Sequence, residues 1–273
     1  MTVGSAFWIA AVRARESERD DRLFDDPFAR ELAGPRGFAT MAASERASGG
    51  ENAFIPVRVR WFDDLTLATV AASVRQVVLL GAGLDTRSHR LDLPAEVDWY
   101  EVDREEILTG KDRVLAAAVA RCRRHPVAGD LTGDWATPLL DAGFDQHRRT
   151  LWLAEGLVFY LTEEMIVAML RTASRLCAPG SLLAADVIGT TGLDSPAMQP
   201  YRNWCAANDV PPPFGADDPT TLLTAGGWEL ADVTAPGAAG ANYGRLPAQP
   251  SGLLPGRTHL VTGRLAEYSA DGP

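Results

Sequence analysis

The sequence predicts an α/β fold in which helices cover a mostly parallel β-sheet. Short aliphatic runs recur along the chain, and each has the continuous apolar character of a strand buried on both faces. Amphipathic helical patterns separate these runs, an arrangement that gives parallel sheets with right-handed crossovers. A glycine pair, Gly81 and Gly83, directly follows the first run. Such a pair lets the backbone turn sharply beneath a nucleotide-like ligand, so we expect a Rossmann-like core.

The expected strands fall into two groups. The parallel group has four aliphatic runs, at residues 76–81, 97–102, 151–154 and 182–187, and a further strand before Asp130. The second group has two runs, at 228–233 and 259–265, with turn-rich sequence between them. Two closing strands of this kind predict an antiparallel edge. Thr162 precedes an amphipathic pattern and is expected to cap the helix between the last two parallel strands.

The chain is predicted to be a single domain with four consecutive parts. These are an N-terminal helical cap, a cofactor-binding core, an inserted lid and a C-terminal edge, at residues 1–73, 74–188, 189–220 and 221–273. In the cap, Ser5 is expected to cap a first helix, and another helix is expected at about 56–72. The insertion is rich in Gly, Pro and aromatic residues, so it is interpreted as an irregular lid or binding loop.

Charge argues against nucleic acid as a partner. The chain contains 26 Lys and Arg residues against 36 Asp and Glu residues, for a formal net charge of −10. An acidic surface repels phosphate backbones. A local basic stretch at Arg121, Arg123 and Arg124 is interpreted as a solvated helix end, where cations are favoured. We therefore expect a small molecule or a peptide as the partner.

Cysteine usage and hydropathy point to the cytoplasm. The three cysteines are scattered without C-x-x-C spacing, and there is no H-E-x-x-H, so no metal site is expected. A sparse, odd number of cysteines suits a reducing compartment. The first apolar run, at residues 6–12, is too short for a signal peptide, and no run has membrane-spanning length. We expect no membrane partner, and the oligomeric state stays open.

Acidic residues follow the expected strands at one edge of the sheet. Asp103 ends the second run, 22 residues after Gly81, where an acid binds the ribose hydroxyls of a nucleotide. Asp130 follows the third strand and could meet an adenine amino group, and Glu155 ends the fourth and could hold an ammonium. Thr86 stands where the dinucleotide fingerprint has its third glycine. These residues therefore favour a ligand in which adenosine is joined to an ammonium-bearing group, rather than NAD.

Four residues close to these positions allow two interpretations each. Asp85 and Arg87 could pair with each other and shape the glycine loop, or they could serve the ligand directly. His89 could act as a base, or it could cap or lie at the surface. Tyr160, just beyond the fourth strand, could reach a substrate or pack in the core.

Seven segments form a recognisable set of motifs: Ala10–Glu16, Leu23–Ala29, Arg58–Asp64, Gly81–Arg87, Tyr100–Asp103, Gly129–Leu131 and Ala154–Leu161. Together they resemble the leucine carboxyl methyltransferase family, particularly its bacterial branch, which includes polyketide O-methyltransferases. The resemblance extends from near the N-terminus to about residue 187 and is loose in the tail. It implies a class I methyltransferase fold, with helices that cap a bound S-adenosyl-L-methionine.

The resemblance also assigns roles to individual residues. Arg58 resembles the arginine that contacts the methionine carboxylate of the cofactor, although Arg60 lies in the same motif and stays an alternative. The other implied cofactor contacts are at the ends of the strands: Gly81, Asp103, Asp130, Leu131 and Glu155. No catalytic residue is assigned.

The expected activity is transfer of a methyl group to an oxygen atom. The resemblance implies that the acceptor is a carboxylate of a small molecule, polyketide or peptide. The absence of an evident catalytic dyad agrees with this, since a carboxylate is ionised at neutral pH and needs no general base. Two other classes stay open: an NAD-dependent oxidoreductase, and a non-catalytic protein that binds adenosylmethionine. Some relatives in the family act on tRNA, but the net charge argues against an RNA substrate here.

Overall fold

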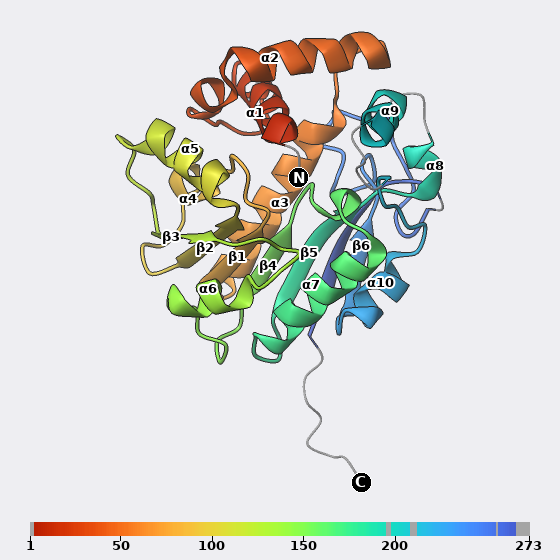
Figure 1. Ribbon diagram of the computed structural model, residues 1–273. Helices are drawn as coiled ribbons and strands as arrows, with labels where there is room; N and C mark the ends of the chain where they lie inside the picture. Colours follow the sequence, from red (N-terminus) through yellow and green to blue (C-terminus); the bar gives the residue numbers. More distant parts are fainter. Residues whose placement is uncertain (1–2, 195–197, 208–211, 255, 266–273) are drawn as a thin grey trace.

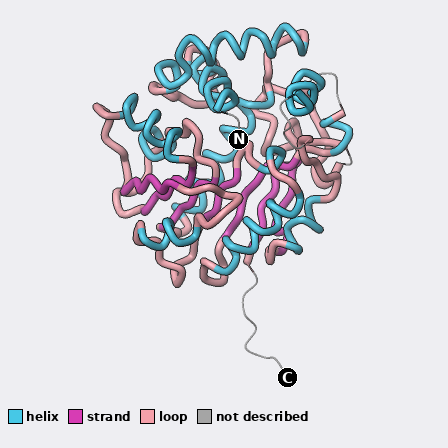
Figure 2. The backbone as a smooth tube through the Cα atoms, in the orientation of Figure 1, coloured by secondary structure: helices cyan, strands magenta, loops and turns pink. Residues whose placement is uncertain are grey.

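A seven-stranded sheet forms the centre of the molecule (Figures 1 and 2). The computed structural model describes residues 3–194, 198–207, 212–254 and 256–265. The strand order is β3-β2-β1-β4-β5-β7-β6. The strands are β1 (Gln76–Leu80), β2 (Asp98–Asp103), β3 (Arg123–Ala128), β4 (Leu151–Ala154), β5 (Leu182–Val187), β6 (Glu229–Thr234) and β7 (His259–Arg264).

The first five strands are parallel, and β7 runs antiparallel to both β5 and β6. The predicted mostly parallel sheet with an antiparallel edge is confirmed. The central strands are unbroken apolar runs in the sequence because helices cover both faces of the sheet. Val78 and Trp152 belong to the core on one face, whereas Val77 and Leu151 belong to the core on the other face.

Helices cover both faces of the sheet and the end at which the parallel strands finish. Figure 1 shows α1 and α2 together at that end, with α8 and α9 beside them. The helices are α1 (Val3–Ser17), α2 (Ala29–Ser48), α3 (Phe54–Ala71), α4 (Arg87–Arg90), α5 (Glu105–Leu115), α6 (Ala136–Asp141), η1 (Val158–Tyr160), α7 (Glu163–Arg175), α8 (Thr190–Leu193), α9 (Gln199–Ala207) and α10 (Pro219–Ala225). Thr162 caps α7 as expected, accepting a hydrogen bond from the Met165 backbone N–H.

Three local predictions were wrong. Ser5 lies inside α1, which already begins at Val3, so Ser5 is not its N-cap. The basic stretch is not a helix end, because Arg123 and Arg124 belong to β3, where Asp98 and Glu101 of the neighbouring strand neutralise them.

The third error concerns the insertion at 189–220, which is more regular than its composition indicated. It contains α8, α9 and the first residues of α10. The parts of the predicted lid at 195–197 and 208–211 lie outside the described residues. None of the described helices is both long and apolar enough to cross a membrane.

Candidate active site

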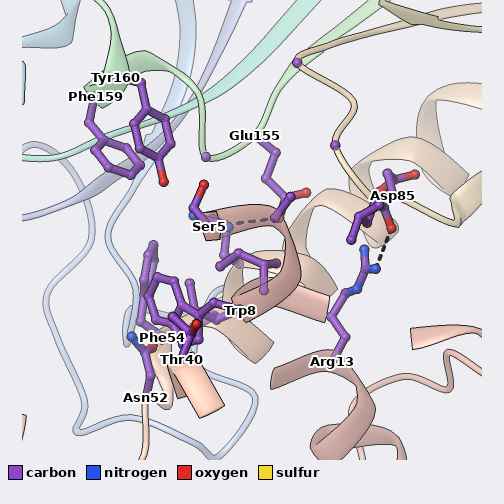
Figure 3. A pocket seen from close by; sticks show the side chains of 18 of the residues that line it. Ser5, Trp8, Arg13, Thr40, Asn52, Phe54, Asp85, Glu155, Phe159 and Tyr160 are labelled. Atoms are coloured by element: carbon purple, nitrogen blue, oxygen red, sulfur yellow. Dashed lines mark hydrogen bonds and ion pairs between the residues drawn. The ribbon is translucent and has the colours of Figure 1, made fainter. Parts of the chain in front are cut away.

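A cavity of about 520 Å³ lies where β1 and β4 end, beneath α1, α2 and the start of α3 (Figure 3). Five of the predicted site residues line it: Arg58, Gly81, Gly83, Glu155 and Tyr160. The other three, Asp103, Asp130 and Leu131, are not in its lining. A volume of this size is typical of sites for small molecules and cofactors.

The glycine loop forms the floor of the cavity and is fastened to the next strand. Gly81 and Gly83 have positive φ angles of 66° and 51°, a conformation that other residues rarely adopt. The backbone N–H of Gly83 donates to Oδ2 of Asp103 at 2.6 Å, and Oδ1 of Asp103 accepts from the Arg104 N–H at 2.7 Å. A carboxylate oxygen can accept more than one hydrogen bond, so Asp103 can hold this loop and still accept from a ribose hydroxyl.

Asp130 and Leu131 follow β3, farther along the same edge of the sheet. Asp130 is exposed, and its side chain accepts hydrogen bonds from the backbone and the hydroxyl of Thr132. These bonds lower the pKa of its carboxyl. The backbone N–H of Gly129 donates to the Asp103 carbonyl at 2.9 Å, which links the ends of the two strands. The strand-end residues predicted from the sequence therefore lie on four adjacent strands: Asp130 after β3, Asp103 on β2, Gly81 after β1 and Glu155 after β4.

The structure separates the two candidate arginines. Arg58 is only 5% exposed and lines the cavity. Its Nε donates to Glu155 and its Nη1 donates to Asp186, each at 3.1 Å. Burial alone would lower the pKa of Arg58, but the two carboxylates raise it overall, so the guanidinium stays charged. Arg60 instead pairs with Asp64 at 2.8 Å outside the cavity, so the geometry favours Arg58 as the ligand contact.

Arg87 connects the glycine loop to the end of β4. Its guanidinium donates to Asp85 and to Glu155, both at 2.6 Å, and to Asp63 at 2.7 Å. Asp85 and Arg87 do pair with each other, which was one of the interpretations that the sequence left open. Burial would raise the pKa of Asp85, but Arg87 and other nearby cations lower it overall. Glu155 is thus held between Arg87 and Arg58 rather than left without a partner.

Sequence analysis missed Asp186, which lies near the end of β5. Its Oδ1 accepts from the Gly156 N–H at 2.6 Å, and its Oδ2 accepts from Arg58. Burial raises the pKa of this carboxyl, although Arg58 opposes the shift. Asp186 occupies a strand end, as Asp103 and Glu155 do, so the signal that identified those acids would also have identified it.

Gly156 fits this site because it has no side chain. Its φ is +61°, and an added Cβ would lie 3.0 Å from Nη2 of Arg58. The absence of a side chain at Gly156 therefore leaves room for the guanidinium between its two carboxylates.

The ion pairs form one connected buried network with an excess of negative charge. Its members are four guanidiniums, Arg13, Arg58, Arg87 and Arg90, and five carboxylates, Asp26, Asp63, Asp85, Glu155 and Asp186. A ligand with a net positive charge would balance the remaining carboxylate. S-adenosyl-L-methionine has an ammonium, a sulfonium and one carboxylate, so the network fits this cofactor.

Two other sequence candidates have clear positions. Tyr160, on η1, lines the cavity, and burial raises the pKa of its phenol to about 12 although a hydrogen bond with Ser5 opposes the shift. His89 is buried rather than at the surface. Its ring packs edge-on against Phe28 and its Nδ1 lies 3.0 Å from the Ser88 hydroxyl. His89 is not in the lining of the cavity.

Comparison with known proteins identifies the family. The sequence profile of the leucine carboxyl methyltransferase family matches residues 6–174. The chain belongs to this family. A protein of Parafrankia sp., named "Putative S-adenosyl-L-methionine-dependent methyltransferase", is 46% identical over 208 residues, which are 73% of this chain and 66% of that one. A protein of Frankia alni with the same type of name is 36% identical over 271 residues, covering 94% of this chain and 93% of that one.

Solved structures show the same fold. A DUF574 family protein of Streptomyces avermitilis has a TM-score of 0.63 at 18% identity, covering 95% of this chain and 96% of that chain. A protein of Thermobifida fusca, described as a "putative methyltransferase", has a TM-score of 0.60 at 19% identity, with 90% and 94% covered. The chain is a methyltransferase of this fold, and its cofactor is S-adenosyl-L-methionine. The NAD alternative is therefore set aside.

Proposed function

We propose that this methyltransferase esterifies a carboxylate of a small molecule, polyketide or peptide. One observation carries the proposal: among the described residues that line the cavity, none is suited to remove a proton from a hydroxyl. An acceptor oxygen that is already ionised needs no such residue. A carboxylate, with an ordinary pKa near 4, meets this condition at neutral pH.

None of the titratable side chains in the described lining is suited to act as a base. Asp85 and Glu155 are committed to arginines in the buried network. The lowered pKa of Asp85 makes its carboxylate an especially weak base. Tyr160 has a raised pKa near 12, so it is a neutral phenol at pH 7 and serves as a hydrogen-bonding group. The remaining titratable groups there are the guanidiniums of Arg13, Arg58 and Arg87.

The chain's own contribution is binding, alignment and exclusion of water. When bound, the cofactor supplies an activated methyl group on its sulfonium. Arg58 would hold the methionine carboxylate, Asp103 the ribose hydroxyls and Asp130 the adenine amino group. Helices α1 and α2 cover the strand ends and keep the acceptor carboxylate poorly hydrated. Such a carboxylate can be aligned with the methyl group, and alignment alone can supply much of the rate.

The chemical stability of the product tests the proposal. Purified protein is incubated with methyl-labelled S-adenosyl-L-methionine and a library of carboxylic acids and matching alcohols. Acid-derived products should release labelled methanol in mild alkali, as methyl esters do. If the label in the purified product resists alkali and only alcohols or phenols accept it, the acceptor is a hydroxyl and the proposal is wrong.

We further propose a cytoplasmic location and no nucleic-acid partner. The described cysteines, Cys122, Cys177 and Cys205, are free thiols, in keeping with a reducing compartment. The basic residues Arg123 and Arg124 are already paired with acids, and the net charge is −10. If the protein does not bind tRNA at low or at high salt, this assignment is supported. Tight binding to tRNA would overturn it.

A further inference from the structure

The cavity has a charged end and an uncharged end. The charged residues in its described lining are members of the buried ion network: Arg13, Arg58, Asp85, Arg87 and Glu155. The opposite part, here called the distal wall, comes from α1, α2 and the segment that enters α3. It consists of uncharged residues: Ser5, Ala6, Trp8, Ile9, Thr40, Ala43, Ser44, Ala47, Asn52, Phe54 and Ile55.

Figure 3 shows how the distal wall is arranged. Trp8, Thr40, Asn52 and Phe54 gather at one end of the view, away from Asp85. Two of these side chains are large aromatics, so this wall suits a flat apolar body. The others contribute a hydroxyl and an amide at the same end of the cavity.

The distal wall holds hydrogen-bond donors that the described residues do not satisfy. The indole nitrogen of Trp8 is buried with no partner in the described part of the chain. The amide oxygen of Asn52 accepts from the Ile55 N–H at 3.1 Å, and its amide nitrogen has no partner among the described residues. The Trp8 nitrogen is closed off from the cavity, whereas the half-buried Asn52 lines it, so a ligand with a suitably placed acceptor oxygen gains by pairing with the Asn52 amide.

We propose that the methyl acceptor is a monocarboxylic acid with an apolar body of aromatic width and an uncharged carbonyl group, such as an amide or ketone, at its far end. This rests on the proposed carboxylate methylation. The reacting carboxylate lies at the strand ends, the body packs against Trp8 and Phe54, and the carbonyl oxygen accepts from the Asn52 amide. A cationic group at that end is disfavoured because it would be desolvated near the Arg58 guanidinium, which lies 5.6 Å from the centre of the Phe54 ring.

Three matched acids test this assignment. They are 3-phenylpropanoates with an isopropyl, a carboxamide or an aminomethyl group in the para position. The first two have nearly the same shape, and only the carboxamide offers a carbonyl oxygen. We expect kcat/KM for the carboxamide to exceed that for the isopropyl acid by about 10-fold, the usual value of a buried hydrogen bond. The aminomethyl acid, which is cationic, should be slower than the carboxamide by about 100-fold or more.

A single substitution should reverse the order of the polar acids. Asn52→Asp keeps the oxygen that accepts from Ile55 but replaces the amide donor with a negative charge. The aminomethyl acid should then overtake the carboxamide. Asn203→Asp makes the same chemical change at an exposed position on α9, outside the cavity lining, and should keep the wild-type order. If the isopropyl acid is preferred by the wild type, or Asn52→Asp leaves the order unchanged, the assignment is wrong.

Calorimetry separates this inference from the proposed function. The three acids are titrated into protein saturated with S-adenosylhomocysteine. If they bind in the expected order but yield no ester, recognition by the distal wall stands and carboxylate methylation fails. If the three acids bind equally and form esters at equal rates, carboxylate methylation stands and recognition by the distal wall fails.

Discussion

The guanidinium of Arg58 and the carboxylate of Asp186 lie 3.1 Å apart although 128 residues separate them in the chain. One belongs to the helix before the sheet, and the other to the last of the parallel strands. Asp186 also accepts from the Gly156 N–H, so it fixes both the arginine and the chain beyond Glu155. We therefore expect Asp186 to act as a positioning residue at the charged end of the cavity.

Asp186→Asn should weaken the binding of S-adenosyl-L-methionine by roughly 10- to 100-fold. The amide keeps the shape of the side chain but removes the charge-assisted hydrogen bond to Arg58, a change worth about 1.5–3 kcal/mol. Calorimetry measures the affinity, and circular dichroism checks that the variant folds. Asp232→Asn, an exposed change on β6, serves as the control and should bind as the wild type does. Equal affinities for the two variants would refute the positioning role.

Gly156→Ala should lower both stability and cofactor affinity. The left-handed backbone at φ +61° costs a non-glycine residue about 1–2 kcal/mol, and the new Cβ also presses on Arg58. Gly240→Ala is a matched control, since it has φ +84° and nothing within 4 Å of the added Cβ. Urea unfolding should show a loss of stability in both variants. Only Gly156→Ala should bind the cofactor more weakly, and a similar loss with Gly240→Ala would count against the contact with Arg58.

His89→Gln should leave the methyl-transfer rate within about threefold of wild type. Because His89 lies outside the cavity lining, it cannot serve the acceptor directly, whereas loss of a true general base costs about 10²–10⁴-fold. The rate should also stay nearly flat between about pH 6 and 8, well above an ordinary carboxyl pKa. A thousandfold loss in a folded His89→Gln protein would restore His89 as a catalytic candidate.

Acid should destabilise the fold through His259. Its ring is fully buried, its Nε2 accepts from the Leu254 N–H at 3.0 Å, and burial lowers its pKa although Asp217 and Asp218 oppose the shift. The neutral ring is favoured in the folded state, so its stabilisation is present above about pH 6.5 and is lost as the pH falls. Urea unfolding at pH 7.5 and 5.5 should show this loss. His259→Gln should reduce it, whereas His147→Gln, at an exposed position, should not.

Much of the fold and part of the site could be predicted because their signals are local. An aliphatic run such as Val77–Leu80 defines a buried strand by itself, and an acid directly after a strand must lie at the ligand edge of a parallel sheet. The choice between Arg58 and Arg60 could not be made that way, because it depends on which side chain turns toward Asp186. Similarly, Arg123 and Arg124 looked like a helix end because their partners, Asp98 and Glu101, come from another strand.

The proposed cofactor contacts come mainly from strand ends, whereas the distal wall comes from α1, α2 and the entry to α3. Substitutions in the distal wall can therefore change which molecule is recognised while leaving the methyl-donor contacts at the strand ends intact. Directed evolution that seeks a new ester product should accordingly mutate Trp8, Thr40, Asn52 and Phe54 and leave the strand-end acids unchanged.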